Sequence, residues 1–122
     1  MSSIEVVALA GGGAPPSGAF GRRRIFETED VRVGETRIGP AGISPWHHHG
    51  SRTLYGYVVS GMLTLEFGPR GAELVRVSAG EFFRIPPGLV HRDVNNAPVE
   101  AVITNVIIGE GPATIDVAGP ER

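Results

Sequence analysis

Apolar and polar residues alternate along short segments of this chain, which is the pattern of β-strands with one buried face. In residues 63–67, Leu-Thr-Leu-Glu-Phe, the three apolar side chains share one face and the polar pair shares the other. Residues 31–33 alternate in the same way. No stretch of ten or more residues has helical apolar spacing without an internal proline or glycine. The pattern therefore predicts an all-β chain with little or no helix.

The predicted strands are short and are separated by turn-forming residues. They cover residues 6–10, 24–28, 31–38, 46–49, 54–60, 62–67, 72–77, 81–85, 91–94, 99–108 and 113–117. The pair Ser60-Gly61 predicts a tight hairpin turn, and residues 67–71 predict a longer loop. Many short antiparallel strands at this spacing favour a sandwich or barrel of two sheets.

The chain length of 122 residues suits a single domain. Residues 1–21 are expected to form an N-terminal strand, at 6–10, and a connection rich in glycine and proline, at 11–21. Residues 22–122 are expected to form the β-barrel domain. The triplet Gly11-Gly12-Gly13 lacks the Gly-Lys-Ser/Thr ending of a phosphate-binding loop, so it is interpreted as part of the connection.

Composition narrows the functions that remain. The net charge of −2 gives no reason to expect a nucleic-acid or membrane partner, since both usually need a concentrated basic face. No apolar run approaches the length of a membrane span, and the N-terminal residues do not resemble a signal peptide, so we expect a cytoplasmic protein. All eleven basic residues are arginine, and cysteine is absent. Thiolate and lysine Schiff-base chemistry are therefore excluded, and any metal must be held by histidine, carboxylate, tyrosine or the backbone.

Three of the four histidines are consecutive, at positions 47–49. On a strand, side chains two residues apart point to the same side, so His47 and His49 share a face while His48 points away. Two imidazoles side by side could bind one metal ion. His48 is interpreted as a solvent-facing or interface residue.

The fourth histidine lies in a second informative stretch, residues 80–95. The fixed residues of this stretch follow the spacing Gly-x5-Pro-x-Gly-x2-His-x3-Asn, where x is any residue. These fixed positions are Gly80, Pro86, Gly88, His91 and Asn95. The stretch resembles the second conserved motif of the cupins at every fixed position. Residues 42–61 resemble the first cupin motif through the pair His47 and His49 and the closing Gly61.

The chain thus looks like a small bacterial single-domain cupin. The resemblance implies a jelly-roll β-barrel, a homodimer, and one divalent transition metal, Fe, Mn, Ni or Zn, held by His47, His49 and His91. The alternative is a barrel that has kept the fold and lost the metal. The motif positions Gly61, Gly80, Pro86, Gly88 and Asn95 are expected to be structural, with Asn95 holding the turn after His91.

One position departs from the cupin pattern. The glutamate that completes the first motif would lie seven residues before Gly61, and that position is Leu54, which cannot bind a metal. Three neutral imidazoles would leave the full charge on the ion, making it a stronger Lewis acid that attracts anionic or enolate-like ligands. Any of Arg52, Arg84 and Arg92 that faces the cavity could assist in binding an anion.

These considerations predict a metal-dependent enzyme that acts on a small anionic or enolisable molecule, through either dioxygenase-like or isomerase/lyase-like chemistry. The pocket is expected to include Leu54, Val58, Phe83 and Arg92. The alternative is a non-catalytic barrel that binds or senses a small molecule. Catalysis would require a titratable group near the metal, and the sequence does not choose among Glu66, Glu81, Asp93 and Glu100. The run Arg22-Arg23-Arg24 is interpreted as a solvated strand end.

Overall fold

The computed structural model describes residues 3–9 and 16–120, and it confirms the all-β prediction. A single 3-10 turn, η1 (Pro69–Gly71), interrupts the strands of the described chain. The strands are β1 (Phe20–Glu27), β2 (Val31–Ile38), β3 (His47–His48), β4 (Thr53–Ser60), β5 (Met62–Phe67), β6 (Glu73–Ser78), β7 (Phe82–Ile85), β8 (His91–Val94), β9 (Ala101–Ile108) and β10 (Ile115–Asp116).

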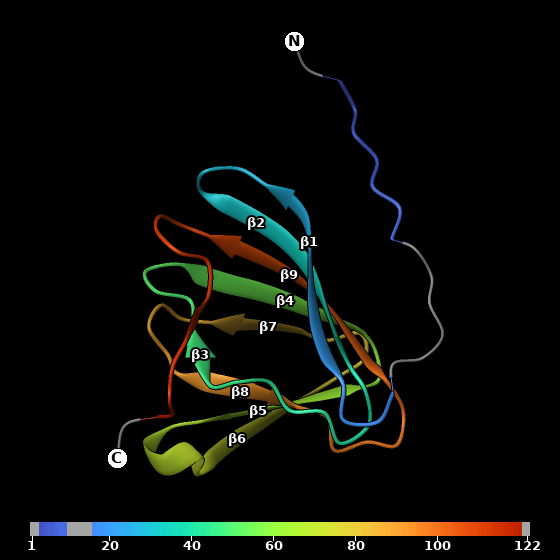
Figure 1. The fold of residues 1–122 in the computed structure, drawn as a ribbon, viewed down its shortest axis with the longest axis vertical. Coiled ribbons are helices and arrows are strands. Elements are labelled where there is room, and N and C mark those ends of the chain that lie inside the picture. Colours follow the sequence, from blue (N-terminus) through green and yellow to red (C-terminus); the bar gives the residue numbers. More distant parts are fainter. Residues whose placement is uncertain (1–2, 10–15, 121–122) are drawn as a thin grey trace.

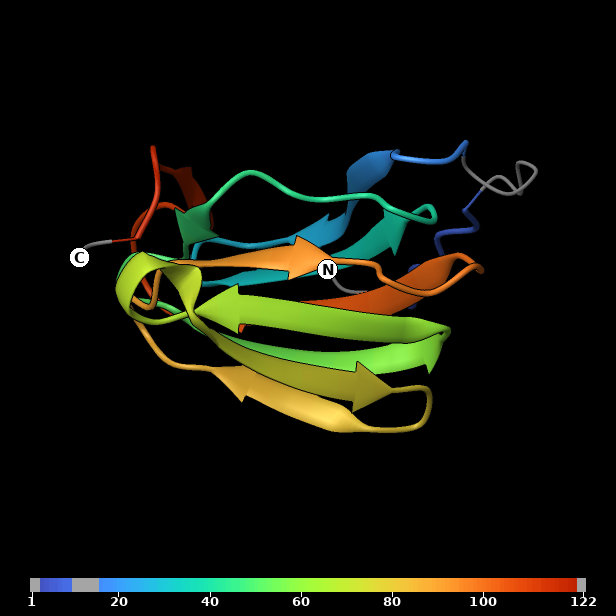
Figure 2. The same ribbon diagram turned by 90° about the horizontal axis from the view of Figure 1, so that it is seen from below.

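The strands form two five-stranded antiparallel sheets. One sheet has the order β1-β2-β9-β4-β7 and the other has the order β10-β3-β8-β5-β6. Figure 1 shows the first sheet above the second, and Figure 2 shows the same strands from below. Neighbouring strands in a sheet are mostly distant in sequence, as for β2 and β9 or β5 and β8. The two layers are therefore connected by repeated crossings from one sheet to the other.

The core lies between the two sheets and is built from the inward faces of the alternating strands. Ile38, Val58 and Ile103 of the first sheet are fully buried, and Leu63 of the second is nearly so. The alternation in β4 is complete on its buried side, where Leu54, Gly56 and Val58 are buried while the intervening tyrosines are not. Burial of one face of each sheet thus follows the pattern visible in the sequence.

The N-terminal prediction is wrong in part. Residues 6–9 form no strand, and Ala10 lies outside the described residues. Val6 is 87% exposed because no other strand pairs with this segment, which extends away from the sheets in Figure 1. The barrel instead begins with β1 at Phe20, two residues before the expected boundary, and β1 forms a long antiparallel pair with β2.

The hairpin between β4 and β5 turns at Gly61, as the sequence predicts. Its φ angle is +78°, a conformation that L-residues rarely adopt. A Cβ atom at this position would also overlap the carbonyl oxygen of Glu100. Gly80, at the turn between β6 and β7, has a φ of +89° with open space around it. The first glycine is therefore required by both conformation and space, and the second by conformation alone.

Candidate metal centre

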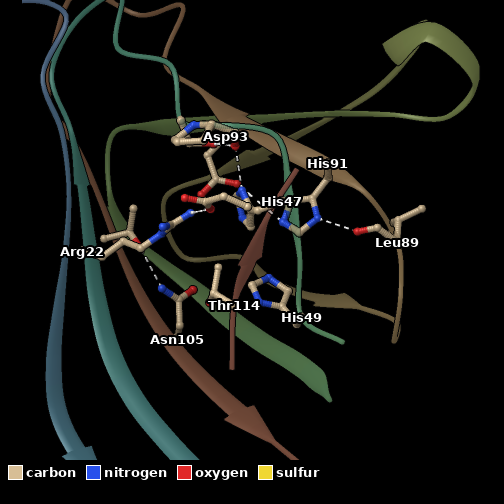
Figure 3. A network of polar contacts seen from close by, with 12 residues as sticks. Arg22, His47, His49, Leu89, His91, Asp93, Asn105 and Thr114 are labelled. Atoms are coloured by element: carbon tan, nitrogen blue, oxygen red, sulfur yellow. Dashed lines mark hydrogen bonds and ion pairs between the residues drawn. The ribbon is translucent and has the colours of Figure 1, made fainter. Parts of the chain in front are cut away.

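His47, His49 and His91 come together in the interior, between the two sheets (Figure 3). His47 of β3 and His91 of β8 are direct partners in the antiparallel ladder, and His49 follows just after β3. Their side chains are almost completely buried, with at most 3% of each residue exposed. One ring nitrogen from each histidine lies within 4.8 Å of those of the other two. Two imidazoles from neighbouring strands and one from the residue after β3 thus converge on one point.

Backbone carbonyl oxygens set the direction of all three rings. Nδ1 of His47 binds the oxygen of Pro45 at 2.8 Å, Nδ1 of His49 binds that of Ala113 at 2.9 Å, and Nδ1 of His91 binds that of Leu89 at 2.9 Å. A carbonyl oxygen can only accept, so each Nδ1 carries the hydrogen and each Nε2 presents its lone pair. The Nε2 atoms of His49 and His91 are buried and have no hydrogen-bond partner.

Burial keeps these imidazoles neutral. It lowers the pKa of His47 to about 4 and that of His49 to about 4, and it also lowers the pKa of His91. The positive charge of Arg22 acts in the same direction on all three. A neutral imidazole whose other nitrogen is held by a carbonyl is the form of histidine that binds metal ions. The donor set therefore fits a divalent transition metal, and the two unpartnered Nε2 atoms are what such an ion would satisfy.

Asp93 brings a carboxylate to the same place. It lies two residues after His91 on β8, and its Oδ1 is 3.8 Å from Nε2 of His91. The side chain is only 15% exposed. Desolvation raises the pKa of this carboxyl, and the nearby His91 and Arg22 reduce that effect. Of the four acidic residues that the sequence left open, Asp93 is the one that lines the cavity.

The histidines form one wall of a cavity that is lined by residues of both sheets and opens to solvent. Its free volume is about 40 Å³, the space of about three water molecules. The lining residues are Arg22, Arg23, Arg32, Gly34, Glu35, Thr36, His47, His49, Leu54, Phe83, Ile85, His91, Asp93, Asn105, Ile107 and Thr114. The cavity accordingly suits a ligand of only a few heavy atoms.

Two of the four predicted pocket residues line this cavity and two do not. Leu54 and Phe83 line it, with the Phe83 ring lying over Gly56. Val58 is fully buried in the core instead. Arg92 lies on the other face of β8, because it alternates with His91 and Asp93. There its Nε is 2.7 Å from Glu66 and its guanidinium covers the ring of Trp46.

The arginines that reach the cavity are not those that the sequence favoured. Arg52 is buried, but its guanidinium donates to the backbone carbonyls of Gly111, Ile107 and Glu29, so it holds loops together. Arg84 alternates with the inward Phe83 and is exposed. The cavity is instead lined by Arg22, Arg23 and Arg32.

Sequence reasoning missed Arg22 and Arg23 because nothing local distinguishes a basic strand end in solvent from one at a cavity. Only the pairing of β1 with β2 brings them to the site. The polar pair Thr36 and Asn105, joined by a 2.9 Å hydrogen bond across β2 and β9, was missed for the same reason.

The remaining sequence candidates lie outside the cavity. His48 points away from the other histidines, and its Nδ1 accepts the amide of Gly50. The carboxylates of Glu66, Glu81 and Glu100 bind Arg92, the amide of Ser78 and Arg37, respectively.

The second motif has a local structural basis. Pro86 and Gly88 form the turn between β7 and β8, and Gly88 has a φ of +76°. Asn95 is completely buried just after β8. Its amide donates to the carbonyls of Ile38 and Val99 and accepts from the amide of Ala97. These contacts anchor the C-terminal end of the strand that carries His91.

Two antiparallel sheets around a small cavity lined by histidine define a β-barrel with a candidate metal centre. The sequence matches the cupin domain family over residues 34–107. The chain therefore belongs to the cupin superfamily.

Curated relatives include a germin-like protein, subfamily 2 member 2, of Arabidopsis thaliana. It is 31% identical over 95 residues, which cover 76% of this chain and 43% of that protein. Nectarin-1 of Nicotiana plumbaginifolia is 30% identical over 91 residues, which cover 73% of this chain and 40% of that protein. The chain thus spans less than half the length of these relatives.

Solved structures show the same fold. An uncharacterized conserved protein with a double-stranded β-helix domain from Klebsiella pneumoniae aligns with a TM-score of 0.74 and 22% identity, covering 84% of this chain and 88% of its own. An oxalate oxidase in complex with the substrate analogue glycolate aligns with a TM-score of 0.69 and 28% identity, covering 88% of this chain and 59% of its own. In the described part of the chain, no helix is long and apolar enough to cross a membrane.

Proposed function

We propose that this protein binds one divalent transition metal through His47, His49 and His91 and is an enzyme that acts on a small anionic or enolisable molecule. The observation that carries the proposal is the set of three buried neutral imidazoles with Nε2 lone pairs turned inward, two of which lack any partner. An unpaired buried nitrogen has a free-energy cost that a bound ion would remove.

The electrostatics of the cavity favour an anion. Arg22, Arg23 and Arg32 line it against two acidic residues, Glu35 and Asp93. The side chain of Arg22 is 32% exposed and its guanidinium lies 3.5 Å from the carboxylate of Asp116, so a ligand that enters from solvent would compete with Asp116 for this charge. The structural relative at 28% identity holds glycolate, a small carboxylate. We infer that the ligand of this protein is a carboxylate of similar size.

The bound metal, the arginines and the apolar side chains of the cavity would each have a separate role. When bound, the metal would supply Lewis-acid chemistry and, if it is iron or manganese, redox chemistry. The arginines would hold the carboxylate of the ligand by charge-assisted hydrogen bonds. Leu54, Phe83 and Ile85 would narrow the cavity and exclude water. Both dioxygenase-like and isomerase/lyase-like reactions are compatible with this arrangement.

A non-catalytic binding barrel is the competing function. It would be favoured if every titratable side chain other than the ligands pointed to solvent. Glu35 is a titratable group that lines the cavity and is not among the ligands, which supports the enzyme over the binding module.

The homodimer and the bacterial origin remain proposals. Tyr55, Val59 and Phe82 are exposed on the outer face of β4 and β7, with 80% of Phe82 exposed, and this apolar surface supports a contact between two copies. Light scattering on the purified protein tests the dimer. The curated relatives described above are plant proteins, so they give no support to the bacterial source that the motif resemblance implies.

The enzymatic proposal is tested by assaying one chelator-treated preparation before and after reloading with Fe²⁺, Mn²⁺, Ni²⁺ or Zn²⁺. The candidate substrates are small hydroxy, oxo and dicarboxylic acids. Their conversion is measured by oxygen consumption and by NMR. We expect turnover with one metal, none in the stripped protein, and none in His91→Ala. Tight binding of a carboxylate without turnover under any metal would favour the binding module.

A further inference from the structure

The position that should supply a carboxylate in the cupin pattern is apolar and well packed here. Leu54 is only 5% exposed, belongs to the hydrophobic core, and pairs in the sheet with Ile85 and Ile107. The sequence of β4 contains no aspartate or glutamate. A carboxylate ligand, if the site has one, must therefore come from another strand.

Asp93 has the position that such a ligand needs. It shares the inward face of β8 with His91, two residues apart, just as His47 of β3 and His49, which follows that strand, point to the same cavity. Its Oδ1 lies 3.8 Å from Nε2 of His91. Two neighbouring ligands of one ion at bond lengths of ~2.1 Å are ~3.0–3.5 Å apart. A shift of less than about 1 Å would bring these two atoms to that separation and would add Asp93 to the group of ligand atoms that the three histidines form in the structure.

Asp93 interacts with the charge of Arg22 at longer range, but within the described residues it forms no ion pair with an arginine. Within the described residues, the carboxylate has an ion-pair contact only with His91, which burial keeps neutral. Glu66 and Glu100, by contrast, each bind an arginine directly. A carboxylate that is largely removed from water and has no cationic contact is unfavourable unless a cation binds beside it. Figure 3 shows the carboxylate turned toward the histidine cluster.

We propose that Asp93 is the fourth protein ligand, so that the carboxylate missing at Leu54 is supplied from β8. The inference rests on the proposed metal site. It gives the metal three imidazoles and one carboxylate, which offsets part of the ionic charge. It also moves the carboxylate from the β4 wall to the β8 wall. The wall formed by Leu54 and Phe83 is then left apolar and faces the ligand.

The test compares Co²⁺ binding by the wild-type chain, Asp93→Asn and Glu66→Gln, using calorimetry and the visible absorption of the bound ion. Glu66→Gln is the matched control, because it removes a carboxylate from the outer face of the neighbouring strand β5. Asp93→Asn should weaken Co²⁺ binding by more than about 100-fold and should change the absorption spectrum. A residue that only hydrogen-bonds to a metal ligand would cost about 10- to 100-fold. Glu66→Gln should bind like the wild type. Metal-free Asp93→Asn should resist urea at least as well as the wild type, because it removes a desolvated charge.

A second variant tests replacement directly. Adding Leu54→Glu to Asp93→Asn returns a carboxylate to the β4 wall and should restore Co²⁺ affinity to within about tenfold of wild type. If that double variant does not fold, as circular dichroism would show, the comparison of Asp93→Asn with Glu66→Gln decides.

The outcomes separate the two proposals. Wild-type protein that binds Co²⁺ together with an Asp93→Asn variant of unchanged spectrum would overturn the assignment of Asp93 and leave the three-histidine site standing. Wild-type protein that takes up no metal would overturn both.

Discussion

Each cavity histidine is oriented by one hydrogen bond from its own Nδ1 to a backbone carbonyl. For His47 and His91 that carbonyl belongs to the residue two positions earlier, so the local chain itself aims the ring. His49 depends on Ala113, a residue distant in sequence, for the same hydrogen bond. The orientation of the donor atoms is thus built into the apo fold, which lowers the entropic cost of binding an ion.

Arg22 provides a test of ligand charge at the residue scale. Replacing it with glutamine should weaken the binding of glycolate to metal-loaded protein by about tenfold or more, since charge-assisted hydrogen bonds contribute about 1.5–3 kcal/mol. Arg84→Gln, an exposed arginine on the outer face of β7, is the matched control and should bind normally. Calorimetry measures both. Equal affinities in Arg22→Gln and the wild type would remove Arg22 from the ligand site.

At the element scale, a strand is predictable from the sequence when clear turn residues bound it and a partner strand pairs with it. Residues 62–67 and 91–94 were predicted with the observed bounds because clear alternation ends at a glycine or proline turn or at a motif position. Residues 6–9 have apolar side chains but no partner strand, and a strand forms only when its backbone groups are paired. The histidine cluster was foreseeable from spacing, whereas Arg22 and Arg23 reach the cavity through the pairing of β1 with β2, which no local pattern reveals.

The two hairpin glycines give a paired prediction. Gly80→Ala should lower the free energy of unfolding by about 1 kcal/mol, the cost of a positive φ for an L-residue. Gly61→Ala should cost about 3 kcal/mol or more, because its Cβ also meets the backbone of Glu100. Urea unfolding of both variants measures the difference. Similar costs would show that the β4–β5 turn can move away from Glu100.

At the scale of the whole molecule, two sheets remove three imidazoles and a carboxylate from water. The apolar side chains of both sheets keep water away from these four side chains. The pKa values of the three histidines therefore fall below their ordinary value. The fold class and its two sheets were predictable from the alternation and the cupin motifs. The identity of the metal and of the substrate depends on side-chain positions of a fraction of an ångström, which patterns in the sequence do not encode.

This burial predicts how the stability of the metal-free protein depends on pH. The folded-state pKa of His47 and of His49 is about 4, below the ordinary value of 6.5, so the unfolded chain binds more protons between these values. The histidine contribution is complete above pH 6.5 and is lost as the pH falls toward 4, by up to about 1.4 kcal/mol per pH unit for each histidine. The raised pKa of Asp93 acts in the opposite sense and only partly offsets this effect.

Urea unfolding of chelator-treated protein at intervals from pH 7.5 to 4.5 measures this dependence. The free energy of unfolding should fall on acidification, and His47→Gln should flatten the profile. A profile in the wild type that is level between pH 6.5 and 5 would contradict the buried, neutral state of the histidines.

The most direct test of the central claim is the metal content of the protein, purified without a histidine tag, in the wild type and in His49→Ala, His91→Ala and His48→Ala. The account predicts about one equivalent of a single transition metal in the wild type and in His48→Ala, whose ring points away from the cavity. It predicts loss of the metal in the other two variants. Wild-type protein that contains no metal and takes up none when metal is added would contradict the account.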